Sequence, residues 1–525
     1  MRTVGERLIE GLAARGVKVV FGIPGVHTVE LYRGLSGSSV RHVTARHEQG
    51  CAFMADGYAR VSGQPGVAFV ITGPGLTNAL TAMAQSRADS VPVLVISGVN
   101  RRASLGKGLG LLHELPDQSA MVRALCPTRL VADPAELGPT LDWAFDLMTH
   151  GRPGPVHIEV PTDVMPLPCP PLQAPAAMRQ RPQPSQDDLS RAAARLNAAQ
   201  NVVILSGGGC RGQEVALRAL AEKLDAPVVQ TVNARGMLHE HPLCVPSSPS
   251  LEANRSLIRA ADQILSIGTE LGPTEYDMDV NGGTPDLAGQ IRIDIDAAQL
   301  ARHPSAIDLQ GDAGTTMAAL LPLIRRHDAN GAERAAAAAT AARQELADSF
   351  AAYAVMLQMV EAIRTALPRA ILIGDSTQPV YAANLIYSHD RPGGYFNAAT
   401  GFGALGFGPG AAVGAALAAP RTHVVCLVGD GGLQFSPGEL RTAVDEKLPI
   451  TFLVWNNAAY REIADAMRRA NTEVIGCHPS PLRLEPFAAA CDLPFTSIPQ
   501  DPEVLHWALT QPSDGPRLIE VRVTA

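Results

Sequence analysis

Two polar interruptions follow apolar runs in the last quarter of the chain. The sequence GDG at 429–431 ends the run VVCLV, and NN at 456–457 ends the run ITFLVW. Continuous apolar runs predict strands that are buried on both faces, and the Ser-Pro-Gly-Glu sequence that starts at Ser436 predicts a connecting helix with this serine as its N-cap. Parallel strands joined by a helix end at the same edge of a sheet, so Asp430 and Asn457 can face one point in space.

One carboxylate and one amide oxygen are ligands that suit a hard cation such as Mg²⁺, which takes its remaining ligands from phosphate and water. Glycines beside Asp430 allow backbone N–H groups to approach a phosphate, and the helix that follows favours negative charge at its N-terminus. Either sequence alone could be an ordinary surface turn or loop cap. The two together, each after a buried strand, favour a shared site for a metal and a phosphate.

The GDG sequence followed at this distance by NN resembles the diphosphate- and metal-binding motif of thiamine-diphosphate-dependent enzymes. The resemblance implies that Mg²⁺ is bound by the side chains of Asp430 and Asn457 and by the carbonyl of Ala459. Many members of the family have glycine near this last position, but any residue supplies a carbonyl. The resemblance also places three glycines against the cofactor: Gly429, Gly431 and Gly432.

Three other stretches resemble further elements of the same family. RHEQGCAFMADGYARVSG at 46–63 is similar to the element whose glutamate contacts the aminopyrimidine ring, which implies this role for Glu48. FVITGPGLTNALTAM at 69–83 is similar to the next conserved stretch and implies that Asn78 contacts the cofactor, and GFGALGFGPG at 401–410 implies that Leu405 supports its bend. A carboxylate at the pyrimidine would promote removal of the C2 proton, which makes the cofactor a carbanion nucleophile.

The resemblance leaves two main reactions open. Both begin with loss of CO₂ from a 2-oxo acid and an enamine intermediate, which a proton captures in a decarboxylase and a second 2-oxo acid captures in an acetohydroxyacid (acetolactate) synthase. LGLLHELPDQ at 109–118 favours decarboxylation, because His113 is a candidate proton relay where synthases tend to carry Phe-Gln-Glu. Glu462, just beyond the metal loop, is a candidate catalytic residue that could act on protons or pair with a cationic substrate tail, although it could also be a helix-start glutamate that faces solvent. Together with Glu114 and Asp117 it favours a basic substrate such as a guanidino 2-oxo acid.

Two further alternatives are a flavin-dependent oxidase and a non-catalytic nucleotide-binding or regulatory protein, and the first depends on the middle of the chain. LSGGGCRG at 205–212 is glycine-rich but lacks the spacing of a dinucleotide-binding fingerprint, and IGTELGPTEYD at 267–277 lacks the arginine that is typical of flavin-binding synthases. These features disfavour FAD and with it a flavin-dependent oxidase. A non-catalytic nucleotide-binding protein is the other alternative, and the combination of Glu48, Asp430 and Asn457 argues against it.

Composition is ordinary for a globular protein of 525 residues with a formal net charge of −8. The charge gives no reason to expect nucleic acid or an anionic membrane as a partner. The eight cysteines are scattered without paired spacing, and the N-terminus lacks the features of a targeting peptide, so we expect a cytoplasmic protein. The family resemblance implies a homodimer or homotetramer with the active site at a subunit interface and a small 2-oxo acid as substrate.

The elements that must position these residues alternate short apolar runs with longer helical stretches throughout the chain. This pattern predicts an α/β protein with three doubly wound parallel-sheet domains: pyrimidine-binding (1–165), central (185–328) and diphosphate-binding (350–525). A proline-rich segment from Pro166 to Asp188 and an alanine-rich helix between His327 and Phe350 would connect them. We expect strands at 17–23, 66–72, 91–97, 201–209, 226–231, 262–268, 290–296, 370–376, 423–431, 450–457 and 517–523.

Overall fold

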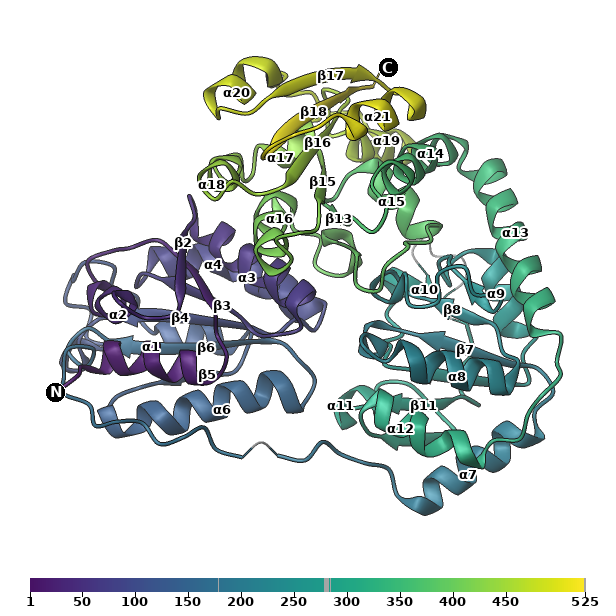
Figure 1. The fold of residues 1–525 in the computed structure, drawn as a ribbon, viewed down its shortest axis with the longest axis horizontal. Helices are drawn as coiled ribbons and strands as arrows, with labels where there is room; N and C mark the ends of the chain where they lie inside the picture. Colours follow the sequence, from purple (N-terminus) through teal and green to yellow (C-terminus); the bar gives the residue numbers. More distant parts are fainter. Residues whose placement is uncertain (178, 278–282, 284, 524–525) are drawn as a thin grey trace.

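The computed structural model describes residues 1–177, 179–277, 283 and 285–523, and it contains three parallel sheets of six strands each (Figure 1). The strands of each sheet come from one block of the sequence, and helices cover the sheets. This confirms the prediction of three doubly wound parallel-sheet domains. The domain boundaries at 165, 185, 328 and 350 stay predictions.

The first sheet has the strand order β2-β1-β3-β4-β6-β5. Alternate residues of its strand β3 lie in different hydrophobic clusters, with Val67 and Phe69 on one face and Ala68 and Val70 on the other, so both faces are buried. The strands are β1 (Val19–Gly22), β2 (Arg41–Thr44), β3 (Gly66–Val70), β4 (Val93–Val99), β5 (Thr128–Leu130) and β6 (Pro155–Pro161). The α-helices are α1 (Val4–Ala14), α2 (Val29–Leu35), α3 (Glu48–Ser62), α4 (Pro74–Ala88), α5 (Gln118–Arg123) and α6 (Leu137–His150).

The central sheet has the order β12-β11-β10-β7-β8-β9, which is the strand order of the Rossmann fold. Its strands are β7 (Val202–Ser206), β8 (Val228–Gln230), β9 (Cys244–Val245), β10 (Gln263–Ile267), β11 (Ile291–Asp294) and β12 (Ile307–Gln310). The α-helices are α7 (Gln186–Ala198), α8 (Glu214–Leu224), α9 (Glu252–Arg259), α10 (Pro273–Tyr276), α11 (Ala297–Leu300) and α12 (Ala313–Leu320).

The third sheet repeats the strand order of the first, as β14-β13-β15-β16-β18-β17. Its strands are β13 (Ile371–Gly374), β14 (Tyr395–Asn397), β15 (Val424–Gly429), β16 (Ile450–Asn456), β17 (Phe495–Pro499) and β18 (Arg517–Arg522). The α-helices are α14 (Ala351–Ala366), α15 (Gln378–Leu385), α16 (Phe407–Ala418), α17 (Asp430–Leu433), α18 (Glu439–Asp445), α19 (Arg461–Arg469), α20 (Leu484–Ala490) and α21 (Pro502–Thr510).

The two predicted connections are present, except that the last three residues of the first, 186–188, already belong to α7. Residues 169–177 and 179–185 contain no helix or strand, and Met178 lies outside the described residues. After the central domain, the chain continues through α13 (Gly331–Ser349), which runs from the central sheet to the third (Figure 1).

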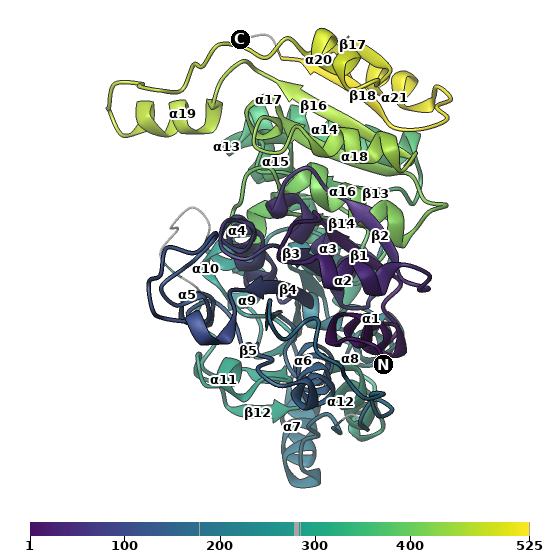
Figure 2. The same cartoon turned by 90° about the vertical axis from the view of Figure 1, so that its left-hand side faces the viewer.

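The first and third sheets share a core through helices α3 and α16 (Figure 2). The helices approach so closely that a Cβ atom on Gly57 would lie 2.1 Å from the carbonyl oxygen of Ala411, and one on Gly414 would lie 1.9 Å from that of Met54. Helix α16 has no charged residue, and most of its residues are buried. Within the described ranges, no helix is long and apolar enough to cross a membrane.

Candidate active site

Asp430 lies directly after β15, and its side chain is 6% exposed. Burial raises the pKa of this carboxyl, and the backbone N–H of Asn457 partly opposes the shift by donating to Oδ1 at 3.4 Å. Both residues therefore lie at the carboxyl ends of the paired strands β15 and β16, as predicted. A buried carboxylate of this kind is stabilised in its charged form when a cation binds beside it.

The segment after Asp430 departs from the predicted helix start at Ser436. GDG is not a loop but opens the short helix α17, and α18 begins only at Glu439, with Gly438 in the N-cap position. Ser436 donates its hydroxyl to the carbonyl of Gly406 at 2.7 Å instead of capping a helix. The carboxylate of Glu439 accepts the backbone N–H groups of Arg46 and His47, each at 3.2 Å, from the first domain. Tertiary contacts thus use the side chain of Ser436, which the prediction had assigned to the helix end, and that of Glu439.

The glycines around Asp430 line the point where the third sheet changes direction, between β13 and β15. A Cβ atom on Gly431 would lie 2.6 Å from Cε1 of Tyr460, so a larger residue would displace this ring. Asp375, which follows β13, was missed by the sequence analysis. It accepts the N–H groups of Gly408 at 3.0 Å and Ser376 at 2.8 Å, and complete burial raises its pKa to about 6. An acid near the end of the apolar run expected at 370–376 was a signal that could have found it.

The side chain of Asn457 belongs to a hydrogen-bonded series that ends at Glu462. Asn457 Nδ2 donates to Gln378 Oε1 at 3.2 Å, and Gln378 Nε2 donates to Glu462 Oε1 at 2.9 Å. The backbone N–H of Ala459 donates to Asn457 Oδ1 at 3.1 Å, which places the carbonyl group of Ala459 in the same short loop. We call these residues the Asp430 cluster: Asp430, Asn457, Ala459, Gln378 and Glu462.

The donor atoms of the Asp430 cluster fit Mg²⁺. They are one carboxylate, one amide oxygen and one backbone carbonyl, and Mg²⁺ prefers such oxygen ligands when phosphate and water complete its shell. Among the described residues, no group of three or more histidine, cysteine or acidic side chains could hold a metal. The cluster therefore suits a hard ion that arrives with a phosphate and does not suit a fully protein-enclosed transition metal.

Glu48 is the first residue of α3, and its side chain is half-buried. Asn78, on α4, donates its Nδ2 to Glu48 Oε2 at 3.0 Å, so the two predicted cofactor contacts lie together. Gln49 Nε2 donates to the carbonyl of Leu405 at 3.5 Å, which brings the half-buried Leu405 beside the same helix end.

His113 lies in a left-handed backbone conformation, with φ of +61°, and its ring packs edge-to-face on His27 with 5.2 Å between centroids. Nδ1 of each ring is buried and has no hydrogen-bond partner among the described residues. Burial, and then the charge of His113, lowers the pKa of His27. Sequence reasoning missed His27, although it lies in the loop after the predicted strand at 17–23.

These residues surround the point where the first sheet changes direction, between β1 and β3. A Cβ atom on Gly73 would lie 2.5 Å from the carbonyl oxygen of His113, and one on Gly75 would lie 3.4 Å from Glu48 Oε1. We call this set the Glu48 cluster: Glu48, Asn78, His27, His113 and Leu405. Within the described part of this single chain, no hydrogen bond joins the Glu48 cluster to the Asp430 cluster.

Two other acids that the sequence had connected with a basic substrate have local roles. Glu114 accepts the backbone N–H groups of Leu109 at 3.1 Å and Leu111 at 2.9 Å, and these bonds lower its pKa. Asp117 is the N-cap of α5 and accepts the N–H of Ala120 at 2.8 Å. Among the three predicted acids, Glu462 alone lies in the Asp430 cluster.

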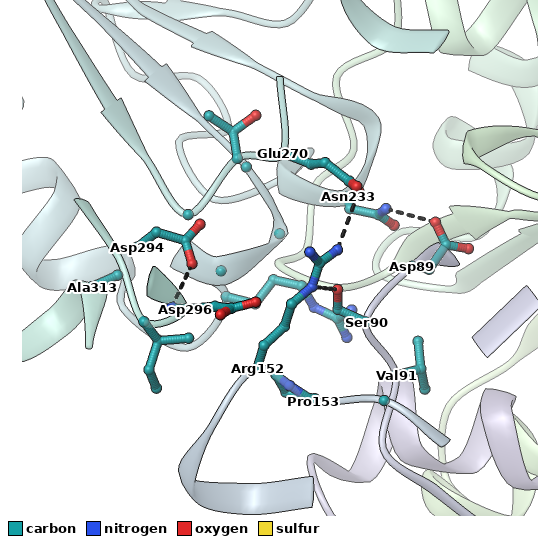
Figure 3. Close-up of a pocket in the computed structure, with 18 of the residues that line it drawn as sticks. Asp89, Ser90, Val91, Arg152, Pro153, Asn233, Glu270, Asp294, Asp296 and Ala313 are labelled. Atoms are coloured by element: carbon teal, nitrogen blue, oxygen red, sulfur yellow. Dashed lines mark hydrogen bonds and ion pairs between the residues drawn. The ribbon is translucent and has the colours of Figure 1, made fainter. Parts of the chain in front are cut away.

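A large crevice of about 1180 Å³ opens at the switch point of the central sheet, between β7 and β10 (Figure 3). Arg152 crosses it, because its guanidinium donates to Ser90 Oγ at 2.8 Å and pairs with Glu270 at 3.2 Å. The glycine-rich loop after β7 packs on the loop after β10, since a Cβ atom on Gly207 would lie 2.3 Å from the carbonyl oxygen of Gly268. This crevice has no lining residue in common with either cluster among the described residues, and the expectation that it does not hold FAD stays a prediction.

Family models of thiamine pyrophosphate enzymes match three parts of the chain. The N-terminal TPP binding domain matches residues 2–121, the central domain matches residues 189–320, and the C-terminal TPP binding domain matches residues 373–521. The Glu48 cluster falls in the first of these regions except for Leu405, and the Asp430 cluster falls in the third.

Curated relatives span nearly the whole chain. "Probable 2-ketoarginine decarboxylase AruI" of Pseudomonas aeruginosa is 42% identical over 91% of this chain and 86% of that protein. The acetolactate synthase isozyme 1 large subunit of Escherichia coli is 30% identical over 100% of this chain and 94% of that protein. An X-ray structure described as a thiamin diphosphate-dependent enzyme from Mycobacterium smegmatis has a TM-score of 0.83 with 23% identity and covers 99% of both chains, which shows the common fold.

Proposed function

Since this chain belongs to the thiamine pyrophosphate enzyme family, we propose that it decarboxylates a guanidino 2-oxo acid with thiamine diphosphate and Mg²⁺. The observation that carries the substrate proposal is the hydrogen bonding of the Glu462 carboxylate. Its Oε1 is bonded to Gln378, while its Oε2 accepts no hydrogen bond from the described residues and stays available for a cation. The similarity to the P. aeruginosa decarboxylase, which exceeds that to the synthases, supports the same reading.

The Asp430 cluster would hold the metal and the diphosphate. Asp430, Asn457 and the carbonyl of Ala459 would bind Mg²⁺, while Gly429, Gly431 and Gly432 would let the backbone approach the phosphates. Thiamine diphosphate, when bound, supplies the carbon nucleophile and accepts the electron pair that the departing CO₂ leaves behind.

The residues of the Glu48 cluster would bind and transfer protons. Glu48 would hold a proton at N1′ of the pyrimidine through the carboxylate that Asn78 orients, and Leu405 would support the cofactor from the neighbouring loop. His113 would deliver the proton that completes the aldehyde product, and His27 would serve as its partner in that relay, because their rings are in contact and each has an unpaired Nδ1.

The recognition of a basic substrate would fall to Glu462. A carboxylate oxygen in a half-buried position can accept a charge-assisted hydrogen bond from a guanidinium group. A neutral 2-oxo acid of the same length would not gain this interaction. Glu462 would therefore act on substrate choice, and the protons of the reaction would be handled elsewhere.

A second function is acetolactate synthesis, which would join two 2-oxo acids. The observation in its favour is the 30% identity to the E. coli synthase subunit across the full length of this chain. His113, in the loop where synthases tend to carry Phe-Gln-Glu, argues for protonation in place of this second addition. The decarboxylase is therefore our first proposal.

The assembly we propose is a homodimer or a homotetramer of such dimers. A dimer would bring the Glu48 cluster of one subunit to the Asp430 cluster of the other, and the lack of a hydrogen bond between these clusters within the described chain supports this arrangement. Exposed apolar side chains occur next to both clusters, among them Val26, Leu112, Phe435 and Ile463. The cytoplasmic location stays a proposal based on the eight cysteines, all of which are free thiols.

One experiment separates these functions. The purified protein is supplied with thiamine diphosphate and Mg²⁺ and presented with a panel of 2-oxo acids, while CO₂ and the organic product are both measured. We expect 5-guanidino-2-oxopentanoate to yield CO₂ and the corresponding aldehyde. Acetolactate formed from pyruvate with comparable or higher efficiency would refute the decarboxylase proposal and support the synthase.

A further inference from the structure

The amide of Asn457 can bind a cation with one of its two ends only. Its Oδ1 is an acceptor and can bind a metal, whereas its Nδ2 carries two donors and would repel one. The two ends have nearly the same shape, so the fold must select the orientation by hydrogen bonds. Asn457 is half-buried in the loop after β16, where the neighbouring polar groups decide which end faces the metal position.

Gln378 is the group that can make this selection. Its side chain is 9% exposed, and its Oε1 accepts from Asn457 Nδ2 at 3.2 Å. This contact turns the nitrogen of Asn457 towards α15 and leaves Oδ1 on the opposite side. The N–H of Ala459 occupies one acceptor position of Oδ1 at 3.1 Å, and a carbonyl oxygen retains a second one for a metal.

Gln378 is itself an amide with two possible orientations, and a carboxylate removes this choice. An ionised carboxylate only accepts hydrogen bonds, so Glu462 Oε1, at 2.9 Å, requires the nitrogen of Gln378 and excludes its oxygen. The hydroxyl of Tyr353 donates to the same oxygen at 3.1 Å, which helps to hold the carboxylate in place. A reversed Gln378 would oppose oxygen to oxygen at one contact and nitrogen to nitrogen at the other.

We infer that Glu462 is a positioning residue for the metal site: through Gln378 it fixes the amide of Asn457 so that Oδ1 faces the cation. The inference rests on the proposed Mg²⁺ site and adds a role for Glu462 that is separate from substrate recognition. The carboxylate acts by the direction of two hydrogen bonds and does not touch the metal.

The test is a mutant cycle read by isothermal titration calorimetry. Mg²⁺ is titrated into the full-length protein at saturating thiamine diphosphate, for the wild type, Glu462→Gln, Gln378→Met and the double variant. A glutamine at 462 can donate as well as accept, so Gln378 is free to reverse. We expect each single variant to raise the Kd for Mg²⁺ roughly tenfold, which is the factor that one misdirected hydrogen bond costs. In the Gln378→Met background, Glu462→Gln should add less than about twofold, because the link between the two residues is gone.

The cycle distinguishes orientation from simple loss of charge. A negative charge near the site would favour Mg²⁺ without any help from Gln378, and Glu462→Gln would then weaken binding equally in both backgrounds. That result would overturn the inference, and so would an unchanged Kd in both single variants. Asp465→Asn is the matched control, since it removes the same charge from α19 at a residue that pairs with Arg468 and Arg461, and we expect it to leave the Kd unchanged.

Two further readouts separate a positioning role from a general loss of structure. Thermal unfolding of each variant without cofactors should match the wild type within a few degrees, and the Kd for thiamine diphosphate at saturating Mg²⁺ should stay within about twofold. A general destabilisation that accounts for the weaker Mg²⁺ binding would refute the inference. If the wild type itself shows no Mg²⁺-dependent binding of thiamine diphosphate, the proposed function fails together with the inference. Wild-type binding with unaffected variants rejects the inference alone.

Discussion

Replacement of Glu462 by glutamine should change which 2-oxo acid the protein prefers. The variant keeps the length and shape of the side chain and removes the negative charge. Oε2 is the oxygen we assign to the substrate, because the hydrogen bonds from Tyr353 and Gln378 both go to Oε1. A substrate with a guanidinium tail should therefore lose a charge-assisted contact, while a substrate with an apolar tail should lose nothing.

The size of the effect follows from the position of the side chain. A hydrogen bond to a charged group contributes about 1.5–3 kcal/mol when it is sheltered from water, and solvent screening reduces this for a half-buried group such as Glu462. A loss of about 1.5–2 kcal/mol corresponds to a decrease of roughly 10- to 30-fold in kcat/KM for the guanidino substrate. For the neutral analogue 2-oxohexanoate we expect less than a twofold change.

The assay must separate this effect from the role of Glu462 in metal binding. Initial rates are measured at Mg²⁺ and thiamine diphosphate concentrations far above the Kd values of the variant, so that all of the protein carries its cofactors. Asp465→Asn serves as the control for loss of charge on the same helix. An equal decrease for both substrates would leave the preference unchanged and would mean that Glu462 does not contact the substrate tail. Unchanged rates with both substrates would likewise refute the contact that we assign between Glu462 and the guanidino group.

Four other substitutions test separate parts of the structure. Glu48→Gln should slow exchange of the cofactor's C2 proton for deuterium by about 10²- to 10⁴-fold, as NMR would measure, and an unchanged rate would exclude Glu48 as the pyrimidine contact. His113→Gln should slow aldehyde release in single-turnover assays more than the release of CO₂; equal slowing would argue against protonation by this residue. Gly431→Ala should raise the Kd for thiamine diphosphate about tenfold in equilibrium titrations, because its Cβ would lie 2.6 Å from the Tyr460 ring, and undisturbed binding would show that the ring moves freely. Burial lowers the pKa of His157 to about 3, so between pH 6.5 and 3 only the unfolded chain binds a proton at this residue, and the free energy of unfolding falls as the pH falls. His157→Gln should make this pH dependence shallower by about 1.4 kcal/mol per pH unit. An unchanged slope in denaturant titrations would contradict the burial argument.

The sequence predicted the interior strands of the three sheets better than their edges. The predicted apolar runs correspond to β1, β3, β4, β7, β8, β10, β11, β13, β15, β16 and β18. The edge strands of all three sheets were missed: β2, β5, β9, β12, β14 and β17. A continuous apolar run marks a strand that is covered on both faces and both sides, whereas an edge strand such as Arg41–Thr44 exposes part of its length to water and lacks such a run.

Strand β6 is the one interior strand that the pattern did not identify. Its sequence PVHIEVP places His157 and Glu159 within the run, and both side chains are buried. Ser97 and Gln118 supply their hydrogen bonds, with 2.8 Å between His157 Nε2 and Ser97 Oγ and 3.0 Å between Gln118 Nε2 and Glu159 Oε2. A local sequence pattern does not reveal hydrogen-bond partners this far away in the chain, so a polar residue in the core is predicted to be exposed.

The candidate site likewise contains some residues that the sequence predicted and others that it did not. The positions of Asp430 and Asn457 could be predicted because each follows an apolar run, whereas Glu48 was identified from the family resemblance of the stretch at 46–63, and the roles of all three stay predictions. Gln378 could not be predicted, because its importance depends on the directions of two hydrogen bonds to side chains 79 and 84 residues away. His27 became significant only when the fold placed its ring against that of His113.

The first and third sheets have the same strand order, and each carries its cluster where this order changes direction. Loops after the first and third strands of an order such as β2-β1-β3 diverge at that point and leave room between them, which is why ligands bind there in open α/β sheets. In the first sheet this place holds the contacting histidines and the turn at 73–75. In the third it holds Asp375 and the glycines at 429–432. The space between these loops comes from the strand order and does not depend on the side chains, so the two sites can differ completely in charge. In the third sheet, a buried acid with backbone donors suits a metal-bound phosphate. In the first, imidazoles and a half-buried glutamate suit proton transfer. The carboxylate of Glu439 joins the two by accepting hydrogen bonds from the backbone that leads into Glu48, so a displacement of α18 would move Glu48 as well.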